Sequence, residues 1–345
     1  EGVPRTLQAA GCPSLEPFPR AAMLSARAAP SLVRAARLCT AATRRVTADA
    51  LVRHVDVSPV AETSTAFVGR SVDLGWGRVY GGQTMAQALA ACQKLVGGDF
   101  SVHQLSCHFL RGGDVSADIR FDCEVLSHGR SFSAIAVRAS QEGAPILAMT
   151  ASFQRAERGL EHQDGLGPLA RGLPAPEDLP TLADRFAPHL AKVPPRLRQL
   201  YSAEANPLDL RPCEFVAPWD ESVRAPRQAV WVRAKDPLPP GDEAVHQRLL
   251  TYFTDWALLG TALQPHPTAM WRRELQAASL SHSVTFHRPF RMDAWLCHVM
   301  RSPSASGGRG FALGEVWSED GRLVASTSQE GLMRVRSTER DRPAG

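Results

Sequence analysis

Residues 129–156 read GRSFSAIAVRASQEGAPILAMTASFQRA, and residues 307–336, GGRGFALGEVWSEDGRLVASTSQEGLMRVR, repeat their pattern, with Gly143 aligned to Gly321. Each copy has two runs of alternating apolar and polar residues, one on either side of a turn. The turn contains a glycine, which supplies the positive φ that tight hairpin turns need. The sequence therefore predicts one β-hairpin in each half of the chain.

Two further pairs of segments repeat upstream of the hairpins. VHQLSCHFLRGGD, from Val102, matches SHSVTFHRPFRMD, from Ser281, and both are typical of strands. Before them lie two helical candidates, GGQTMAQALAACQKLV from Gly81 and TYFTDWALLGTALQP from Thr251. Their small and apolar residues are not confined to one narrow face, which indicates buried helices.

A buried helix followed by antiparallel strands, occurring twice, predicts an α+β protein in which each sheet wraps round a central helix. This is the tandem, or double, hotdog arrangement. The two sheets can pair edge to edge, which removes an exposed edge. The order of helix and then strands argues against a doubly wound fold, where the two would alternate.

The prolines divide the chain, because proline interrupts regular elements. We expect an N-terminal hotdog over residues 46–158, a proline-rich and partly structured linker over 159–226, and a C-terminal hotdog with the catalytic residues over 227–337. A tail, 338–345, follows. Some helix is expected inside the linker, around residues 182–190.

Residues 1–45 differ in composition from the rest. No Asp or Glu occurs from Pro17 to Ala48, while six arginines are interleaved with Ala, Ser and Leu. This is transit-peptide composition and predicts mitochondrial import. The alternatives are an arginine-rich tail that carries no address, and a peroxisomal or cytoplasmic enzyme. The chain begins with Glu1, so Met23 is an alternative start.

Composition limits the other classes of function. The 345 residues are 44% apolar, enough to fill two cores, and the formal charge is +4. Lys and Arg are scattered among Asp and Glu in the second half, so nucleic acid is not expected as a partner. The chain has no charge-free apolar run of about 20 residues, so a membrane-spanning helix is not expected. The seven cysteines lack a C-x-x-C pair, so neither a zinc site nor a disulfide framework is expected. This cysteine usage predicts a reducing compartment.

Several motifs, in order, resemble the acyl-CoA thioesterase II family, which includes the bacterial enzyme and the peroxisomal acyl-CoA thioesterase of animals. The resemblance runs from about Phe67 to Arg336 and spares the proline-rich middle. It implies the double hotdog, hydrolysis of fatty acyl-CoA to CoA and free fatty acid without a cofactor, and a homodimer or homotetramer. The motifs are YGGQTMAQAL, HFLRGGD, SFSAIAVRA, MTASFQ, FTDWALLGTALQPH, SHSVTFHRPF, SGGRGF and VASTSQEGLMR.

The resemblance also implies the catalytic residues. The family holds the attacking water with an Asp, a Ser or Thr, and a Gln, which correspond here to Asp255, near the start of the second central helix, Ser279 and Gln329. Backbone N–H groups at that helix start would stabilise the oxyanion. Taken alone, Asp255 would be a helix cap, Ser279 a turn hydroxyl and Gln329 an exposed strand residue.

The chain departs from the family pattern at two places. Ser281-His282-Ser283 stands where the family usually has Asp-His-Ser, and Val284-Thr285 stands where it has Met-Trp. We expect the first change to remove a charge near the site and the second to reshape the acyl tunnel. Gln83 and His282 are candidates for substrate binding. Gly81-Gly82 lies in the half without the catalytic residues and is interpreted as close helix packing.

Other chemistries are less well supported. No G-x-S-x-G motif indicates a nucleophilic serine, although other serine triads stay open, and no histidine spacing indicates zinc. The alternatives that remain are a hotdog enoyl-CoA hydratase, which would want an Asp/His pair, and a non-catalytic acyl-CoA binding protein.

Overall fold

The computed structural model describes residues 45–61 and 63–336. The predicted targeting segment, apart from Arg45, and the tail 338–345 therefore lie outside the described residues. Within the described part, one sheet of twelve strands runs in the order β1-β2-β4-β5-β6-β3-β9-β12-β11-β10-β8-β7. The two halves meet at the pair β3–β9. Going outward from this junction, the strands of the N-terminal half are β3, β6, β5, β4, β2 and β1, and their counterparts in the C-terminal half are β9, β12, β11, β10, β8 and β7. The two halves therefore repeat about the junction.

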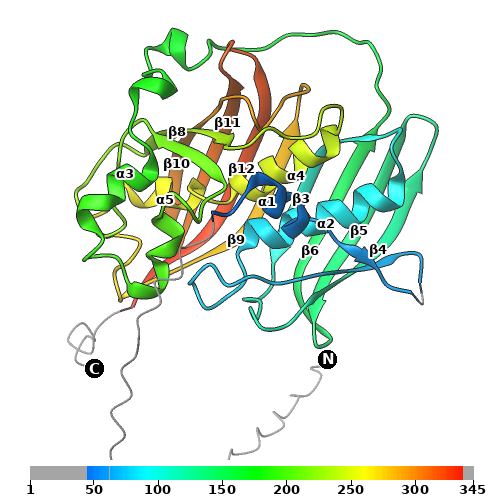
Figure 1. The fold of residues 1–345 in the computed structure, drawn as a ribbon, viewed down its shortest axis with the longest axis horizontal. Coiled ribbons are helices and arrows are strands. Elements are labelled where there is room, and N and C mark those ends of the chain that lie inside the picture. The colour runs from blue at the N-terminus through cyan, green and yellow to red at the C-terminus, as the bar shows by residue number, and fades with distance from the viewer. Residues whose placement is uncertain (1–44, 62, 337–345) are drawn as a thin grey trace, which may run out of the picture. The chain divides into compact units, whose positions relative to one another are not determined.

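The N-terminal half begins with a short helix and two short strands, which are followed by one long helix and four consecutive strands (Figure 1). The predicted helix from Gly81 is confirmed, and so is the predicted hairpin, whose turn at Glu142 and Gly143 has φ of 48° and 77°. The elements are α1 (Ala48–His54), β1 (Ser58–Pro59), β2 (Ala66–Gly69), α2 (Gly81–Val96), β3 (Ser101–Phe109), β4 (Ile119–His128), β5 (Phe132–Gln141) and β6 (Ala144–Gln154).

The C-terminal half repeats this layout, and its predicted hairpin, β11–β12, is also confirmed. One prediction was wrong: the single helix expected from Thr251 is interrupted at residues 255–257. The elements are β7 (Leu208–Pro212), β8 (Arg227–Ala234), α4 (Glu243–Thr254), α5 (Leu258–Leu263), β9 (Leu275–Phe286), β10 (Leu296–Ser306), β11 (Arg309–Ser318) and β12 (Leu323–Val335).

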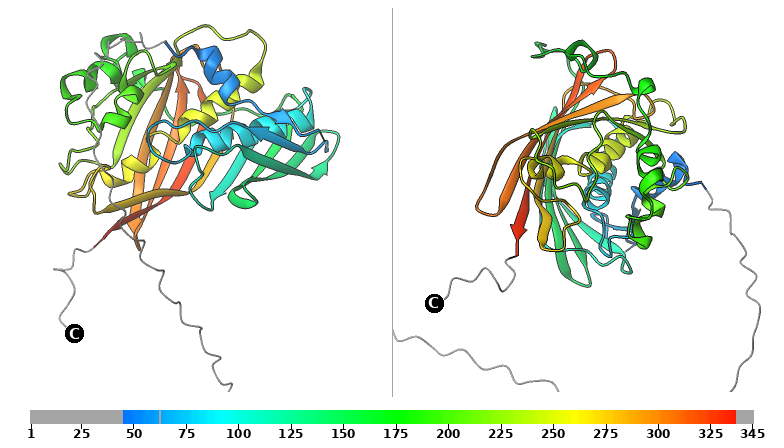
Figure 2. Two further views of the ribbon diagram at one scale, coloured as in Figure 1. Left: turned by 60° about the horizontal axis from the view of Figure 1, so that its bottom comes forward. Right: turned by 90° about the vertical axis from the view of Figure 1, so that its left-hand side faces the viewer.

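The sheet curves round the two long helices, which lie together on its inner face (Figure 2). Every residue of α2 from Gly82 to Cys92 is buried, because small side chains let α4 and the sheet approach it closely. One continuous apolar core joins both halves. The tandem hotdog prediction is confirmed by this arrangement.

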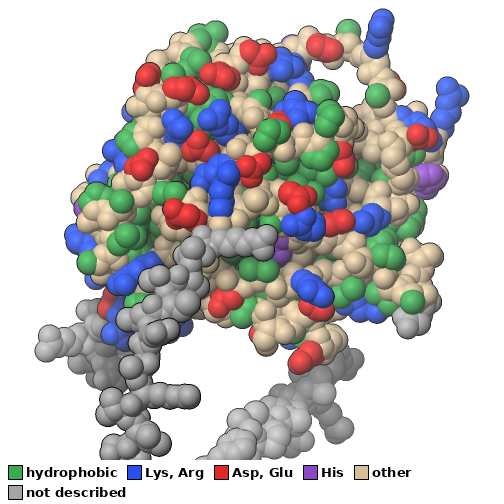
Figure 3. Space-filling view, viewed as in Figure 1, with side chains coloured by type: hydrophobic (Ala, Val, Ile, Leu, Met, Phe, Trp, Pro, Cys, Tyr) green, Lys and Arg blue, Asp and Glu red, His purple; other side chains and the backbone are tan. Residues whose placement is uncertain are grey.

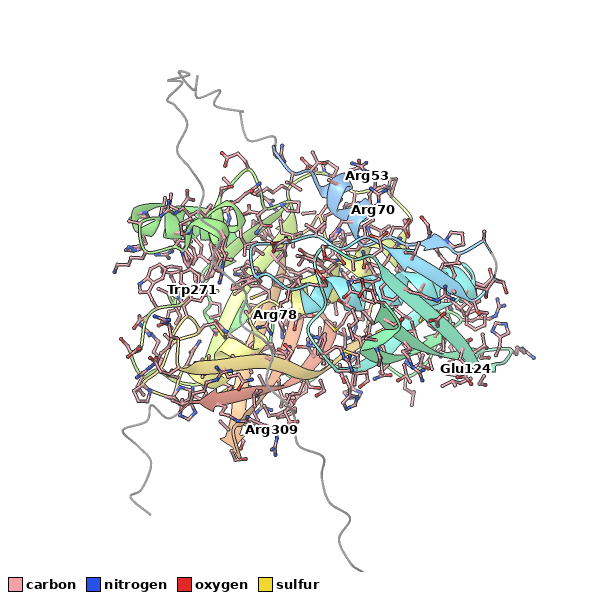
Figure 4. All side chains as sticks on the ribbon, turned by 90° about the horizontal axis from the view of Figure 1, so that it is seen from below. Arg53, Arg70, Arg78, Glu124, Trp271 and Arg309 are labelled. Carbon is pink, nitrogen blue, oxygen red and sulfur yellow. The ribbon has the colours of Figure 1, made fainter. Side chains whose placement is uncertain are left out.

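The proline-rich segment, residues 159–226, carries short helices and strand β7. The expected helix is found at α3 (Leu182–Phe186), which runs into the 3₁₀ turn Ala187–His189. The segment forms an aromatic cluster that reaches the C-terminal half: Tyr201 contacts Trp256, with ring centroids 6.3 Å apart, and Trp271, at 6.0 Å. Trp271 lies on the side covered by this segment, and Glu124 lies at the opposite end of the sheet (Figure 4).

Charges of both signs are interspersed on the face shown in Figure 3. Among the helices of the described residues, none is long and apolar enough to cross a membrane.

Candidate active site

The structure brings Asp255, Ser279 and Gln329 into direct contact. Gln329 donates from Nε2 to Asp255 Oδ1 at 2.6 Å and to Ser279 Oγ at 2.8 Å. The Ser279 hydroxyl donates to the same carboxylate oxygen at 3.3 Å. Three residues separated by up to 74 positions therefore form one closed hydrogen-bond triangle.

Asp255 occupies the break between the two helices of the C-terminal half. It is the residue that follows the last turn of α4, and α5 begins three residues later at Leu258. The expectation that it lies near the start of the helix was therefore wrong. The first turn of α4 is at the other end of that helix, so the free N–H groups that follow Asp255 in the sequence are those of the first turn of α5.

A β-bulge brings Ser279 to the inner face of the sheet. Side chains alternate along a strand, so Ser279 and His282, three residues apart, would normally point to opposite faces. Strands β9 and β12 pair His282 with Gln329 and Ser279 with Gly331, and the register shifts between Glu330 and Gly331. The extra residue of β9 restores Ser279 to the face of Gln329.

The donors in this triangle are all accounted for. Both hydrogens of the Gln329 amide and the Ser279 hydroxyl hydrogen are used inside it. Gln329 Oε1 is buried and has no hydrogen-bond partner among the described residues. Asp255 Oδ2 accepts one N–H, from Gly82 at 3.0 Å, and a carboxylate oxygen can accept two. Two acceptors, Gln329 Oε1 and Asp255 Oδ2, therefore remain for an external donor.

The environment of Asp255 makes it a better base than an ordinary carboxylate. Burial raises its pKa from 3.8 to about 6, while the hydrogen bonds from Gln329, Ser279 and Gly82 act in the opposite direction. Desolvation therefore outweighs three donors. A carboxylate with this pKa is mostly ionised at pH 7 and accepts a proton more readily than a surface Asp.

The N-terminal half also reaches the triangle, which the sequence analysis missed. Gly82, in the first turn of α2, donates its backbone N–H to Asp255, and the Tyr80 hydroxyl donates to the Tyr252 carbonyl at 3.0 Å. The signal in the sequence is the glycine pair at the helix start, which close packing explains only in part.

The two candidates for substrate binding have partners inside the protein. Gln83 is fully buried and donates from Nε2 to the Arg70 carbonyl at 2.9 Å. His282 is fully buried, with Nε2 3.0 Å from Thr254 Oγ1, and burial lowers its pKa to about 3. Neither side chain is exposed to solvent, and Gln83 Oε1 and His282 Nδ1 have no hydrogen-bond partner among the described residues.

The departures from the family pattern lie away from the triangle. Ser281 precedes the inward-facing His282 and pairs with Glu330 and His108, so its side chain is on the outer face of the sheet. Thr285 points to that face too, and Val284 is fully buried in the core. The expected loss of charge beside the site is therefore corrected, and the reshaping of the acyl tunnel by Val284-Thr285 stays a prediction.

A double hotdog with a carboxylate, a hydroxyl and an amide at its centre is the class of protein that the fold and site define. Residues 71–154 match the model of the acyl-CoA thioesterase N-terminal domain, and residues 203–332 match that of acyl-CoA thioesterase. The chain is 37% identical to acyl-CoA thioesterase 2 of Haemophilus influenzae over 268 residues, 78% of this chain and 92% of that protein. The chain belongs to the acyl-CoA thioesterase family.

Other relatives agree. Human acyl-coenzyme A thioesterase 8 is 37% identical over 278 residues, 78% of this chain and 85% of that protein. The crystal structure of the acyl-CoA thioesterase II TesB2 from Mycobacterium marinum superposes with a TM-score of 0.66 at 34% identity, covering 83% of this chain and 98% of that one. A hot dog fold protein of unknown function from Alicyclobacillus acidocaldarius, 21% identical, has a TM-score of 0.65, covers 84% of this chain and 99% of that one, and shares the fold.

Proposed function

We propose that the protein hydrolyses fatty acyl-CoA to CoA and a free fatty acid by direct attack of a water that Asp255, Ser279 and Gln329 position. The observation that carries this proposal is the hydrogen-bond triangle, whose amide orients a buried carboxylate with a raised pKa. The family membership of the chain supports the reaction class. The triangle supports the roles of the three residues.

The two acceptors that remain in the triangle suit one water molecule. Its two hydrogens point to Asp255 Oδ2 and Gln329 Oε1, which leaves a lone pair of the oxygen directed at the thioester carbonyl carbon. As the C–O bond forms, Asp255 takes one proton, and the carbonyl electrons move to the oxygen. When the tetrahedral intermediate collapses, the C–S bond breaks and the thiolate takes the proton from Asp255. Positioning of this kind turns a bimolecular attack into an effectively unimolecular one.

The alternative chemistries fit the contacts of Asp255 less well. An enoyl-CoA hydratase would want a histidine beside the carboxylate. Here His282 is bonded to Thr254, and the partners of Asp255 are an amide, a hydroxyl and a backbone N–H. A non-catalytic binder would have no need for a carboxylate that is costly to bury.

The experiment is thiol release from acyl-CoA esters of increasing chain length, measured for the wild type, Asp255→Asn, Ser279→Ala and Gln329→Ala. Asp122→Asn is the control, since Asp122 lies half-exposed in a surface pair with Arg120. We expect Asp255→Asn to lower kcat by about 10³-fold or more and the control to match the wild type. Normal turnover by Asp255→Asn would refute the assignment. Tight binding without release by the wild type would make the protein a binder.

We also propose mitochondrial import, on the composition of residues 1–45, and assembly as a homodimer or homotetramer. The location of the full chain fused to a fluorescent protein, compared with a chain that starts at residue 46, tests the first. Light scattering of the purified protein tests the second.

A further inference from the structure

Asp255 caps a helix that belongs to the other half of the protein. The first-turn N–H groups of an α-helix lack partners within the helix, and a side chain before the helix commonly accepts from one of them. At α2 that residue is Tyr80, whose side chain makes no such bond. The N–H of Gly82 instead donates to Asp255 Oδ2, 173 residues away, at 3.0 Å.

This contact requires the absence of a side chain at Gly81. A Cβ built on Gly81 would lie 2.7 Å from Asp255 Oδ2 and 2.9 Å from Phe109 Cε1, closer than real Cβ atoms approach other atoms. A Cβ on Gly82 would collide with the Tyr252 carbonyl oxygen. Neither glycine has a positive φ, so the backbone would tolerate another residue. Space for the carboxylate, rather than backbone freedom, explains the glycine at position 81.

The helix end also contributes electrostatically. The aligned peptide dipoles of the 16-residue helix place partial positive charge at its N-terminus, which favours a carboxylate over a carboxylic acid there. This attraction opposes the rise in the pKa of Asp255 that desolvation causes. It acts at Oδ2, whereas Gln329 and Ser279 donate to Oδ1. The two halves thus hold opposite oxygens of one carboxylate.

We propose that Gly81 and Gly82 are positioning residues for catalysis: the N-terminal hotdog holds the general base of the C-terminal hotdog in place and keeps it ionised. The inference rests on the proposed role of Asp255. It makes the half without the triangle a required part of the active site rather than a repeat that has lost its function.

The other titratable groups around Asp255 stay neutral near pH 6, so its titration can be followed. They lie directly before α2, on β3, in α4 and on β9. Burial, together with the charge of Asp255, raises the pKa of Tyr80 and of Cys107, and burial raises that of Tyr252 and lowers that of His282 to about 3.

The first test is Gly81→Ala. Alanine favours a helix more than glycine does, by about 1 kcal/mol, so the helix itself is not weakened. We expect kcat to fall about 10²-fold, as for a displacement of a catalytic group by roughly 1 Å. We also expect the acidic limb of kcat/KM to move to higher pH, because the carboxylate loses a donor. Gly98→Ala, with open space at its Cβ, is the matched control and should retain wild-type values.

Two further variants separate an effect on Asp255 from simple crowding. Phe109→Leu relieves the clash with the ring but not the clash with the carboxylate. We expect the double variant, Gly81→Ala with Phe109→Leu, to be as slow as Gly81→Ala, and Phe109→Leu alone to be active. This result would show that Gly81 acts through Asp255. Recovery of activity in the double variant would overturn the proposal. In a double-mutant cycle of Gly81→Ala with Asp255→Asn, the two losses of kcat, expressed as free energies, should not add.

A measurement on the folded wild type covers the case in which Gly81→Ala does not fold. With ¹⁵N-glycine labelling, the amide signal of Gly82 should shift with pH at the pKa of Asp255 and stay fixed in Asp255→Asn. An amide signal that does not titrate in the wild type would refute the contact. If Asp255→Asn is inactive but Gly81→Ala is normal, only this inference fails; if Asp255→Asn is fully active, the proposed function fails first.

Discussion

Gln329 Nε2 lies 2.6 Å from Asp255 Oδ1 and 2.8 Å from Ser279 Oγ, and it donates one hydrogen to each. The amide group is therefore fixed by two bonds, and its orientation decides which atom faces the carboxylate. A carboxylate in its place would reverse the electrostatics of the contact.

Gln329→Glu should therefore inactivate the enzyme at neutral pH. Two carboxylates this close share one proton, which raises the pKa of the pair. We expect kcat/KM at pH 7 to fall at least about 10²-fold and its acidic limb to move up by more than one pH unit. Gln329→Ala is the comparison, because it loses orientation without adding charge and should move the limb less. Equal limbs in the two variants would contradict this account.

The wild-type pH profile should report Asp255. In the proposed mechanism Asp255 acts as the base in its ionised form, and burial raises its pKa to about 6. We expect kcat/KM to be level above pH 7 and to fall about tenfold per unit well below pH 6. Burial lowers the pKa of His282 to about 3, so this histidine does not produce the limb. A profile that stays level down to pH 4.5 would be incompatible with Asp255 as the base.

The same shift makes stability depend on pH. The folded pKa of Asp255 exceeds its unfolded value, so between pH 3.8 and about 6 the native state binds more protons than the unfolded state. Its contribution to the free energy of unfolding is therefore present in full below pH 3.8 and is lost as pH rises through 6. The full loss is about 3 kcal/mol. Urea unfolding at pH 4 and pH 7, for wild type against Asp255→Asn, measures it; parallel pH dependences would argue against the shift.

The repeat was readable from the sequence because its signals are local. Alternation and a glycine turn specify each hairpin, and the apolar surface of α2 specifies its burial. The helix break at Asp255 was not readable, because FTDWALLG continues a helical pattern and only packing interrupts it. The bulge on β9 and the contact of Gly82 with Asp255 depend on pairing between distant segments. Asp255 does cap a helix, as an isolated Asp suggests, but that helix lies in the other half of the chain.

Thr254, the residue before Asp255, fixes the neighbouring histidine. Its hydroxyl has one hydrogen, which it donates to the Thr251 carbonyl at 3.1 Å, so it accepts from His282 at 3.0 Å. Burial lowers the pKa of His282 to about 3, so at neutral pH the ring carries one proton, which this contact places on Nε2. Thr254→Val keeps the shape of the side chain but leaves that buried N–H without an acceptor.

We expect Thr254→Val to lower the free energy of unfolding by about 1–3 kcal/mol, the cost of an unsatisfied buried donor. Thr254→Ser keeps the hydroxyl and loses one methyl group, so it should cost about 1 kcal/mol. Denaturant unfolding of the three proteins at pH 7 measures both differences. If Thr254→Ser proves the less stable of the two, packing of the methyl group, rather than the bond to His282, is what this position contributes.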